Sequence, residues 1–161
     1  MTIELTHTTG ANPRSVALRT AMDRETYAMY ESEFAAMDEQ TLQRVSLALA
    51  TNQDELTHVV IASEDGVDLG HAALRALADG GFEVKKVFVH PFARGRGLSR
   101  ILMATIEDAA RARGESRIVL QTGPKQVEAI SLYAAIGYEP IDAFAPYVGL
   151  DDMVFFGKAL R

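Results

Sequence analysis

The sequence contains no cysteine. This absence excludes disulfide bonds, thiolate nucleophiles and thiolate metal ligands. No apolar run approaches the roughly 20 residues that a membrane-spanning helix needs. The first ten residues also lack the basic start and the apolar stretch of a signal peptide. We therefore expect a cytoplasmic protein that does not associate with membranes.

Positive charge is also scarce, because 16 lysines and arginines stand against 22 aspartates and glutamates, a formal net charge of -6. Binding to nucleic acid or to an anionic membrane needs clustered cations, so the composition disfavours both partners. The histidines are scattered without metal-ligand spacing, and we expect no metal site and structural roles for all four: His7, His58, His71 and His90. A length of 161 residues suits one compact domain, residues 1–161.

Apolar patterns and turn signals divide the chain into strands and helices. Strands are predicted over residues 2–8, 58–62, 67–77, 82–89, 118–121, 138–141 and 153–156. Helices are predicted around residues 18–29, 42–49, 98–113 and 126–136. This order of elements predicts an α+β domain, in which helices pack on a mostly antiparallel sheet.

The strand over residues 82–89 leads into the most informative segment. Its apolar alternation slips between Val84 and Val87, which predicts a β-bulge that bends the strand away from a neighbour. The chain then reads Arg94-Gly95-Arg96-Gly97 and begins a helix at Leu98. The first amides of a helix lack internal partners and carry the positive end of its dipole, so an anion such as pyrophosphate should bind at this turn.

A glycine-rich turn is a weak signal by itself, because a tight strand-to-helix turn with solvated arginines has the same pattern. Two nucleotide-binding motifs are absent: the turn has neither the Gly-Lys-Ser/Thr of a P-loop nor the Gly-x-Gly-x-x-Gly of a dinucleotide-binding fold. Further motifs have to decide between an anion site and an ordinary turn.

Arg94-x-x-Gly97-x-Ser99 resembles the acyl-CoA signature of the GNAT acetyltransferases, which is usually Gln/Arg-x-x-Gly-x-Gly/Ala. One helix and one strand later, a second run resembles the family's second signature: Gln126-x-x-Ala129-Ile130-x-Leu132-Tyr133-x-x-x-Gly137-Tyr138. The resemblance extends from Phe82 to Tyr138. It implies the GNAT fold, a mostly antiparallel mixed sheet of six or seven strands whose fourth and fifth strands are splayed, flanked by about four helices.

The resemblance also implies the residues that hold acetyl-CoA. In the family, the backbone of the splayed fourth strand, here Val87, Phe88 and Val89, pairs with the pantetheine arm. The turn holds the pyrophosphate, here Arg94, Gly95, Arg96, Gly97, Leu98 and Ser99. Gln126 stands near the pantetheine where Asn is usual, and Ser99 replaces the usual Gly or Ala. The Ser99 side chain would either add a phosphate contact or crowd the site.

Two catalytic residues follow. Tyr133 matches the position whose hydroxyl protonates the departing CoA thiolate, although a half-buried structural tyrosine would give the same pattern. The attacking amine must be neutral, and Glu83 is our first candidate for the base, directly or through water, unless it is a solvent-facing strand residue. His90 is a reserve base. Candidates for an acceptor pocket are Tyr27, Tyr30, Tyr147 and the acidic pair Asp151-Asp152.

The resemblance therefore implies an acetyl-CoA-dependent N-acetyltransferase (EC 2.3.1.-), which we expect to transfer an acetyl group directly to a primary amine of a small molecule in a ternary complex. Alternatives are a non-catalytic acyl-CoA-binding or sensor domain, a protein N-terminal or lysine acetyltransferase, and an interaction domain with a decayed site. Family analogy also allows a homodimer. The sequence alone does not identify the acceptor.

Overall fold

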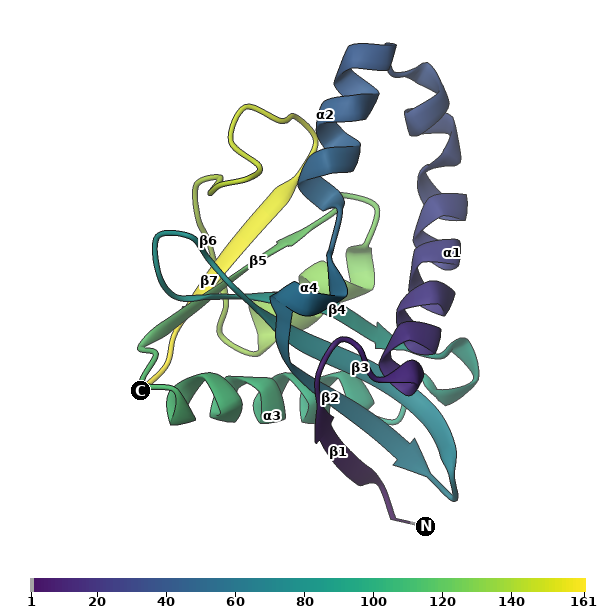
Figure 1. The fold of residues 1–161 in the computed structure, drawn as a ribbon, viewed down its shortest axis with the longest axis vertical. Helices are drawn as coiled ribbons and strands as arrows, with labels where there is room; N and C mark the ends of the chain where they lie inside the picture. Colours follow the sequence, from purple (N-terminus) through teal and green to yellow (C-terminus); the bar gives the residue numbers. More distant parts are fainter. Residues whose placement is uncertain (1) are drawn as a thin grey trace.

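The computed structural model describes residues 2–161, which form a seven-stranded sheet with helices on both faces (Figure 1). The sheet order is β1-β2-β3-β4-β5-β7-β6, and only β4 and β5 run parallel. The strands are β1 Glu4–Thr8, β2 Leu56–Glu64, β3 Val67–Ala76, β4 Phe82–Val89, β5 Arg117–Thr122, β6 Glu139–Pro140 and β7 Val154–Ala159. The helices are α1 Pro13–Ala36, α2 Glu39–Leu49, α3 Leu98–Ala112 and α4 Val127–Ala135, with short 3-10 turns η1 Gln53–Glu55 and η2 Pro91–Ala93. This arrangement confirms the α+β fold.

Alternation along the strands divides the core between the two faces of the sheet. On one face, the amphipathic helix α3 packs on β2, β3 and β4 and buries Leu102 and Ile106. On the other face, α1 packs Leu18 against Ile61 of β2 and Phe88 of β4. Helix α3 therefore lies on the opposite side of the sheet from α1 and α2, as Figure 1 shows. Among the helices described between residues 2 and 161, none combines the length and apolarity needed to cross a membrane.

Strand β4 contains the predicted bulge. Ala73 of β3 pairs with Lys85, whereas His71 pairs with Phe88, so β4 has one residue more than β3 in this interval. Within it, Lys86 takes the left-handed conformation, with φ of 55°. Bulges bend and twist the strand that carries them.

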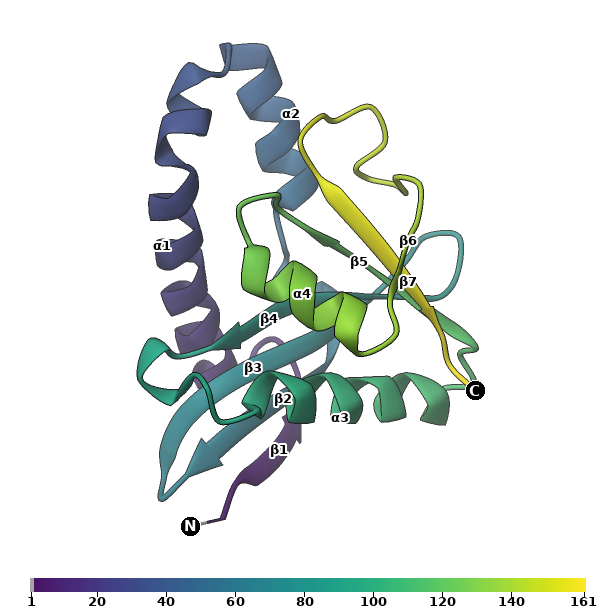
Figure 2. The same cartoon turned by 180° about the vertical axis from the view of Figure 1, so that it is seen from behind.

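The bulge coincides with the point where β4 and β5 separate. Strand β4 pairs with β5 only over Phe82–Val84, opposite Ile118–Leu120. Beyond this point the two strands diverge towards α4, which Figure 2 shows from behind. Among the strands described for residues 2–161, β3 alone flanks the later part of β4, residues 87–89, which leaves its other edge open. The splayed pair is confirmed.

Several element ends differ from the sequence prediction, and two of these differences have a clear local cause. Helix α1 is longer than the predicted 18–29 segment at both ends and runs on to Ala36. It begins earlier because Asn12 caps its first turn and Pro13 occupies the first helical position. The strand expected over residues 138–141 shrinks to Glu139–Pro140. A proline has no N–H to continue a ladder, which limits this edge strand.

Candidate active site

A cleft of about 390 Å³ follows the open side of the splayed strands. Its walls come from α1, from β4 beyond the bulge, from the turn before α3 and from α4. The cleft brings together the residues predicted to hold acetyl-CoA, except Arg96: Val87, Phe88, Val89, Arg94, Gly95, Gly97, Leu98, Ser99, Gln126 and Tyr133. The two sequence motifs, separated by a helix and a strand, thus face one space.

The turn between β4 and α3 presents uncapped amides to this cleft. Gly97 is the N-cap residue, with φ of 78°, and no side chain caps the helix. The first N–H to bond back along the helix is that of Ile101, which donates to the Gly97 carbonyl at 3.2 Å. The amides of Leu98 and Ser99 therefore remain free for a ligand at the positive end of a 15-residue helix.

The arginines of the turn bind acidic side chains. Arg94 Nη2 donates to both carboxylate oxygens of Glu25 on α1, at 2.7 and 2.9 Å, and its Nε donates to the Val89 carbonyl at 3.0 Å. Arg96 instead donates to Glu64 at 2.8 and 3.0 Å and lies outside the cleft lining. Arg94 therefore joins α1 to β4 at the edge of the cleft, whereas Arg96 points away from it.

Tyr133 projects from α4 into the cleft and is only 5% exposed. Its ring packs against Tyr138 and Phe156, with ring centroids 5.7 and 6.0 Å away. Burial raises the pKa of the Tyr133 hydroxyl, because an anionic phenolate would lose its hydration there. The phenol consequently remains protonated at neutral pH and has a proton to give.

Gln126 lines the cleft but uses its side chain within the loop that precedes α4. Its Oε1 accepts hydrogen bonds from the Gly123 amide at 2.9 Å and from the Thr122 hydroxyl at 3.1 Å. Across the cleft, the Tyr30 hydroxyl of α1 accepts from the Lys125 amide at 2.9 Å. Gln126 thus orders the β5–α4 loop, and Tyr30 ties α1 to it.

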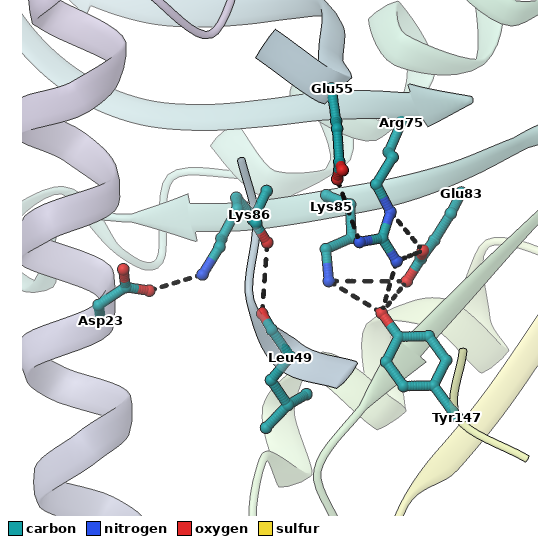
Figure 3. Close-up of polar contacts among 9 residues, drawn as sticks. Asp23, Leu49, Glu55, Arg75, Glu83, Lys85, Lys86 and Tyr147 are labelled. Atoms are coloured by element: carbon teal, nitrogen blue, oxygen red, sulfur yellow. Dashed lines mark hydrogen bonds and ion pairs between the residues drawn. The ribbon is translucent and has the colours of Figure 1, made fainter. Parts of the chain in front are cut away.

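Glu83 is fully buried on the sheet face opposite α3, in a network drawn in Figure 3. Its Oε2 accepts from Arg75 Nε at 3.1 Å and from Arg75 Nη2 at 2.5 Å. Its Oε1 accepts from the Tyr147 hydroxyl at 2.6 Å, and Lys85 Nζ donates to that hydroxyl at 2.9 Å. Glu83 is therefore no solvent-facing residue, and both of its oxygens are occupied.

Sequence reasoning did not single out Arg75 and Lys85. One signal was available: Glu83 and Lys85 are two apart in a strand, so both side chains point to the same face. That face is the one opposite Val84, which is buried against α3. Two charged residues on the second face of a central strand indicate a buried ionic cluster.

The other candidate side chains are dispersed. Tyr27 is exposed, as are Asp151 and Asp152, and none of the three lines the cleft. The His90 ring stacks on that of Phe92, with centroids 5.0 Å apart, and lies outside the cleft lining. Of the proposed acceptor-side tyrosines, only Tyr147 belongs to the Glu83 cluster.

His71 supports the bulge of β4. Its Nδ1 donates to the Lys86 carbonyl at 2.8 Å, and its Nε2 accepts from the Ser15 hydroxyl of α1, also at 2.8 Å. Burial is the main reason why the pKa of this histidine is lowered to about 4. The ring is therefore neutral at physiological pH, with the tautomer that the carbonyl requires.

Comparison with known proteins agrees with this geometry. The family model described as the acetyltransferase (GNAT) family matches residues 20–138. A stretch of 98 residues is 40% identical to an IAA acetyltransferase of Azospirillum brasilense, covering 60% of this chain and 63% of that protein. Another, of 106 residues, is 31% identical to an L-methionine sulfoximine/L-methionine sulfone acetyltransferase of Salmonella typhimurium, covering 63% of this chain and 59% of that protein. The matches thus span about three fifths of the length of these two relatives.

Among solved structures, one from Klebsiella pneumoniae, described as a candidate acyl-CoA N-acyltransferase, superposes with a TM-score of 0.76. The two chains are 28% identical, and the superposition covers 99% of this chain and 98% of that one. The agreement extends over the whole sheet and its helices.

Proposed function

Because the chain belongs to the GNAT acetyltransferase family, we propose that it is an N-acetyltransferase that takes its acetyl group from acetyl-CoA. The acceptor we propose is a primary amine of a small molecule. The observation that carries the proposal is the cleft. It joins free amides at the start of α3, an unpaired strand edge at residues 87–89 and the Tyr133 hydroxyl.

Each of these features fits one part of acetyl-CoA. The amides of Leu98 and Ser99 suit the pyrophosphate, since a helix N-terminus offers aligned donors and a positive dipole. The backbone of residues 87–89 suits the amide groups of the pantetheine arm, which can add to a free strand edge as another strand would. This placement directs the thioester towards the point where β4 and β5 separate, with Tyr133 on the α4 side.

The proposed transfer is direct. The nitrogen of the acceptor attacks the thioester carbonyl carbon, the carbon–sulfur bond breaks, and Tyr133 donates a proton to the departing sulfur. A main-chain N–H near Val89 is our candidate for stabilising the oxyanion. The chain offers no thiol for a covalent acyl-enzyme.

The names of two relatives support a small acceptor. Both are named for small molecules, and one of these, L-methionine sulfoximine, is an amino-acid derivative with a primary amine. A protein acetyltransferase would have to admit a polypeptide to the same reacting centre. A non-catalytic acyl-CoA-binding domain needs the same cleft but gives Tyr133 no chemical role.

Calorimetric titration with acetyl-CoA tests the proposal, with Gly97→Asp as the variant and Asp151→Asn as the control. Aspartate at position 97 would place a negative charge beside the free amides and strain a backbone with φ of 78°. We expect binding by the wild-type protein and the control, and loss of binding in Gly97→Asp. Thiol release with L-methionine sulfoximine and a panel of primary amines then tests transfer. Binding without release would favour the non-catalytic alternative, and failure of the wild-type protein to bind would exclude both.

A further inference from the structure

Lys85 is a buried basic residue that no step of the proposed transfer uses. Its side chain is 8% exposed. Among the contacts of residues 2–161, its Nζ makes one hydrogen bond, to the Tyr147 hydroxyl at 2.9 Å. The Glu83 Oε1 atom is 3.7 Å away, beyond hydrogen-bond range. An ammonium has three N–H donors, so the charged form leaves two of them unpaired in the interior, which is costly. A neutral amine at this place avoids that cost and has a lone pair free for a proton.

The charged groups around Lys85 come from four elements. Glu83 of β4 attracts its charge, while Arg75 of β3 and Lys86 of β4 repel it. Glu83 is largely neutralised by Arg75, and the Tyr147 hydroxyl uses its own proton on Glu83. The outer residues of the network are Glu55 of η1, 3.7 Å from Arg75, and Asp23 of α1, 2.7 Å from Lys86. Burial is the largest effect, and it lowers the pKa of Lys85 to about 8.

Lys85 also lies where the two strands part. Val84 is the last residue of β4 that pairs with β5, and Lys85 follows it directly. The residues just beyond, Val87 and Phe88, line the cleft. Figure 3 shows the Lys85 side chain between the Lys86–Asp23 pair and the Glu83–Tyr147 pair, on the sheet face that carries α1. Lys85 itself lies outside the cleft lining, on the other face of the sheet from α3. An acyl group that enters along residues 87–89 would reach the gap between the strands beside it, and an acceptor in that gap would meet its amine.

We propose that Lys85 accepts the proton that the ammonium group of the acceptor must lose before attack, with Glu83 and Tyr147 holding its amine in place. This inference rests on the proposed acetyl transfer. Lys85 rather than Glu83 takes the proton, because both oxygens of Glu83 already accept hydrogen bonds. Glu83 is then a positioning residue.

The protons and bonds balance. The acceptor enters as an ammonium and gives one proton to the neutral Lys85 amine. The nitrogen lone pair forms the carbon–nitrogen bond, and the carbon–sulfur bond breaks. Tyr133 gives its proton to the sulfur, and the nitrogen then loses a second proton, which restores the Tyr133 hydroxyl. Lys85 returns its own proton to water. The products are the acetamide, the free thiol and one released proton.

The first test measures the protonation of Lys85 directly. The chain has four lysines, Lys85, Lys86, Lys125 and Lys158, so the Cε signals of protein labelled with ¹³C-lysine can be assigned by single substitutions and followed against pH. The three other lysines serve as internal controls, because each pairs with a carboxylate: Asp23, Glu33 and Glu107. We expect Lys85 to titrate at least one pH unit below them. A Lys85 midpoint equal to theirs would overturn the proposal, whatever the acceptor is.

The second test compares Lys85→Arg, which keeps the charge but cannot release a proton near neutral pH, with Lys85→Met, which loses both. With L-methionine sulfoximine as acceptor at pH 8, we expect both variants to lose about 100-fold or more in kcat/KM. Acetyl-CoA affinity by calorimetry should change little. Thermal unfolding checks that each variant folds. If a variant does not fold, the titration of Lys85 in the wild-type protein still tests the proposal.

Two kinetic outcomes distinguish the failure of the Lys85 proposal from the failure of the proposed acetyl transfer on which it rests. If Lys85→Arg retains wild-type turnover, charge alone suffices and the role of Lys85 as proton acceptor is refuted, while acetyl transfer stands. If the wild-type protein binds acetyl-CoA but releases no thiol with L-methionine sulfoximine or a panel of primary amines, both proposals fall.

Discussion

Tyr133 and Glu83 are both buried polar side chains, but their surroundings give them different chemistry. Tyr133 has aromatic neighbours and lines the cleft. Glu83 lies among Arg75, Lys85 and Tyr147, and its oxygens are occupied by donors. The first arrangement leaves a proton available for transfer. The second fixes a charge and orients the groups around it.

Replacing Tyr133 with phenylalanine removes the proposed proton donor and keeps the ring that packs against Tyr138. We expect kcat to fall about 100-fold or more, since general acids contribute factors of this order. Acetyl-CoA affinity measured by calorimetry should stay nearly unchanged. The matched control is Tyr138→Phe, because Tyr138 donates its hydroxyl to Glu107 at 3.0 Å and lies outside the cleft. Unchanged turnover in a folded Tyr133→Phe protein would refute the assignment.

Replacing Glu83 with glutamine removes the only negative charge inside the cluster and leaves Arg75 and Lys85 buried beside a neutral amide. Breaking one side of a buried ion pair costs about 3–5 kcal/mol, and we expect a loss of that order in the free energy of unfolding. Urea denaturation measures it. Glu64→Gln serves as the comparison, because its partner Arg96 is exposed and the pair contributes little. A loss below 1 kcal/mol in Glu83→Gln would show that the cluster has no such role.

At the level of secondary-structure elements, β4 joins the two halves of the site. Its first residues pair with β5, its bulge ends that pairing, and its last residues form a wall of the cleft. The unfavourable conformation of Lys86 is held by the hydrogen bond from His71 to its carbonyl. His71 is in turn bound to Ser15, so helix α1 and the bulge are coupled through one imidazole.

His71 makes stability depend on pH. Its pKa is lowered to about 4 in the folded protein, against about 6.5 for an unperturbed histidine. The unfolded chain therefore binds more protons between these values, so stability present above pH 6.5 is lost as the pH falls towards 4. We expect about 2 kcal/mol of this loss between pH 7 and pH 5. Urea denaturation at the two pH values measures it, and His71→Gln should reduce the difference. An equal loss in both proteins would assign the effect to other groups.

Much of this local structure was predictable because its signals are local. The slipped alternation of residues 82–89 indicates the bulge, and Gly97 and Gly114 delimit α3. The two short motifs predicted most of the residues that line one wall of the cleft. The environment of Glu83 could not be read in the same way, because its partner Tyr147 is 64 residues distant and lies in a segment without periodicity. The same holds for Arg94, whose partner Glu25 is 69 residues away.

On the scale of the whole molecule, the cleft is bordered by segments from both halves of the chain. Helix α1 contacts it near Glu25 and is tied to the β5–α4 loop by Tyr30. Strand β4 and the turn before α3 form its opposite border, and α4 closes the far side. A ligand in this cleft contacts elements that are distant in sequence, so binding should stabilise the fold as a unit.

Acetyl-CoA should therefore raise the melting temperature of the protein. A ligand that binds only the folded state stabilises it by about 2.7 kcal/mol at 100 times its dissociation constant. We expect a shift of several degrees in differential scanning calorimetry, and none for Gly97→Asp under the same conditions. Pantetheine, which has the arm but lacks the pyrophosphate, provides the ligand control. An equal shift in the wild-type protein and in Gly97→Asp would place the binding site elsewhere.

The short pairing of β4 with β5 has a mechanical consequence. The sheet consists of two panels, β1 to β4 and β5 to β7, that share only the residues 82–84 and 118–120 as a seam. Arg75 and Glu83 belong to the first panel, whereas Tyr147 precedes β7 of the second and packs on Phe155. Their hydrogen bonds fasten the panels together next to the seam. The cluster around Lys85, which is proposed to accept a proton from the acceptor, therefore also limits how far β4 and β5 can separate at the place proposed for the acyl group.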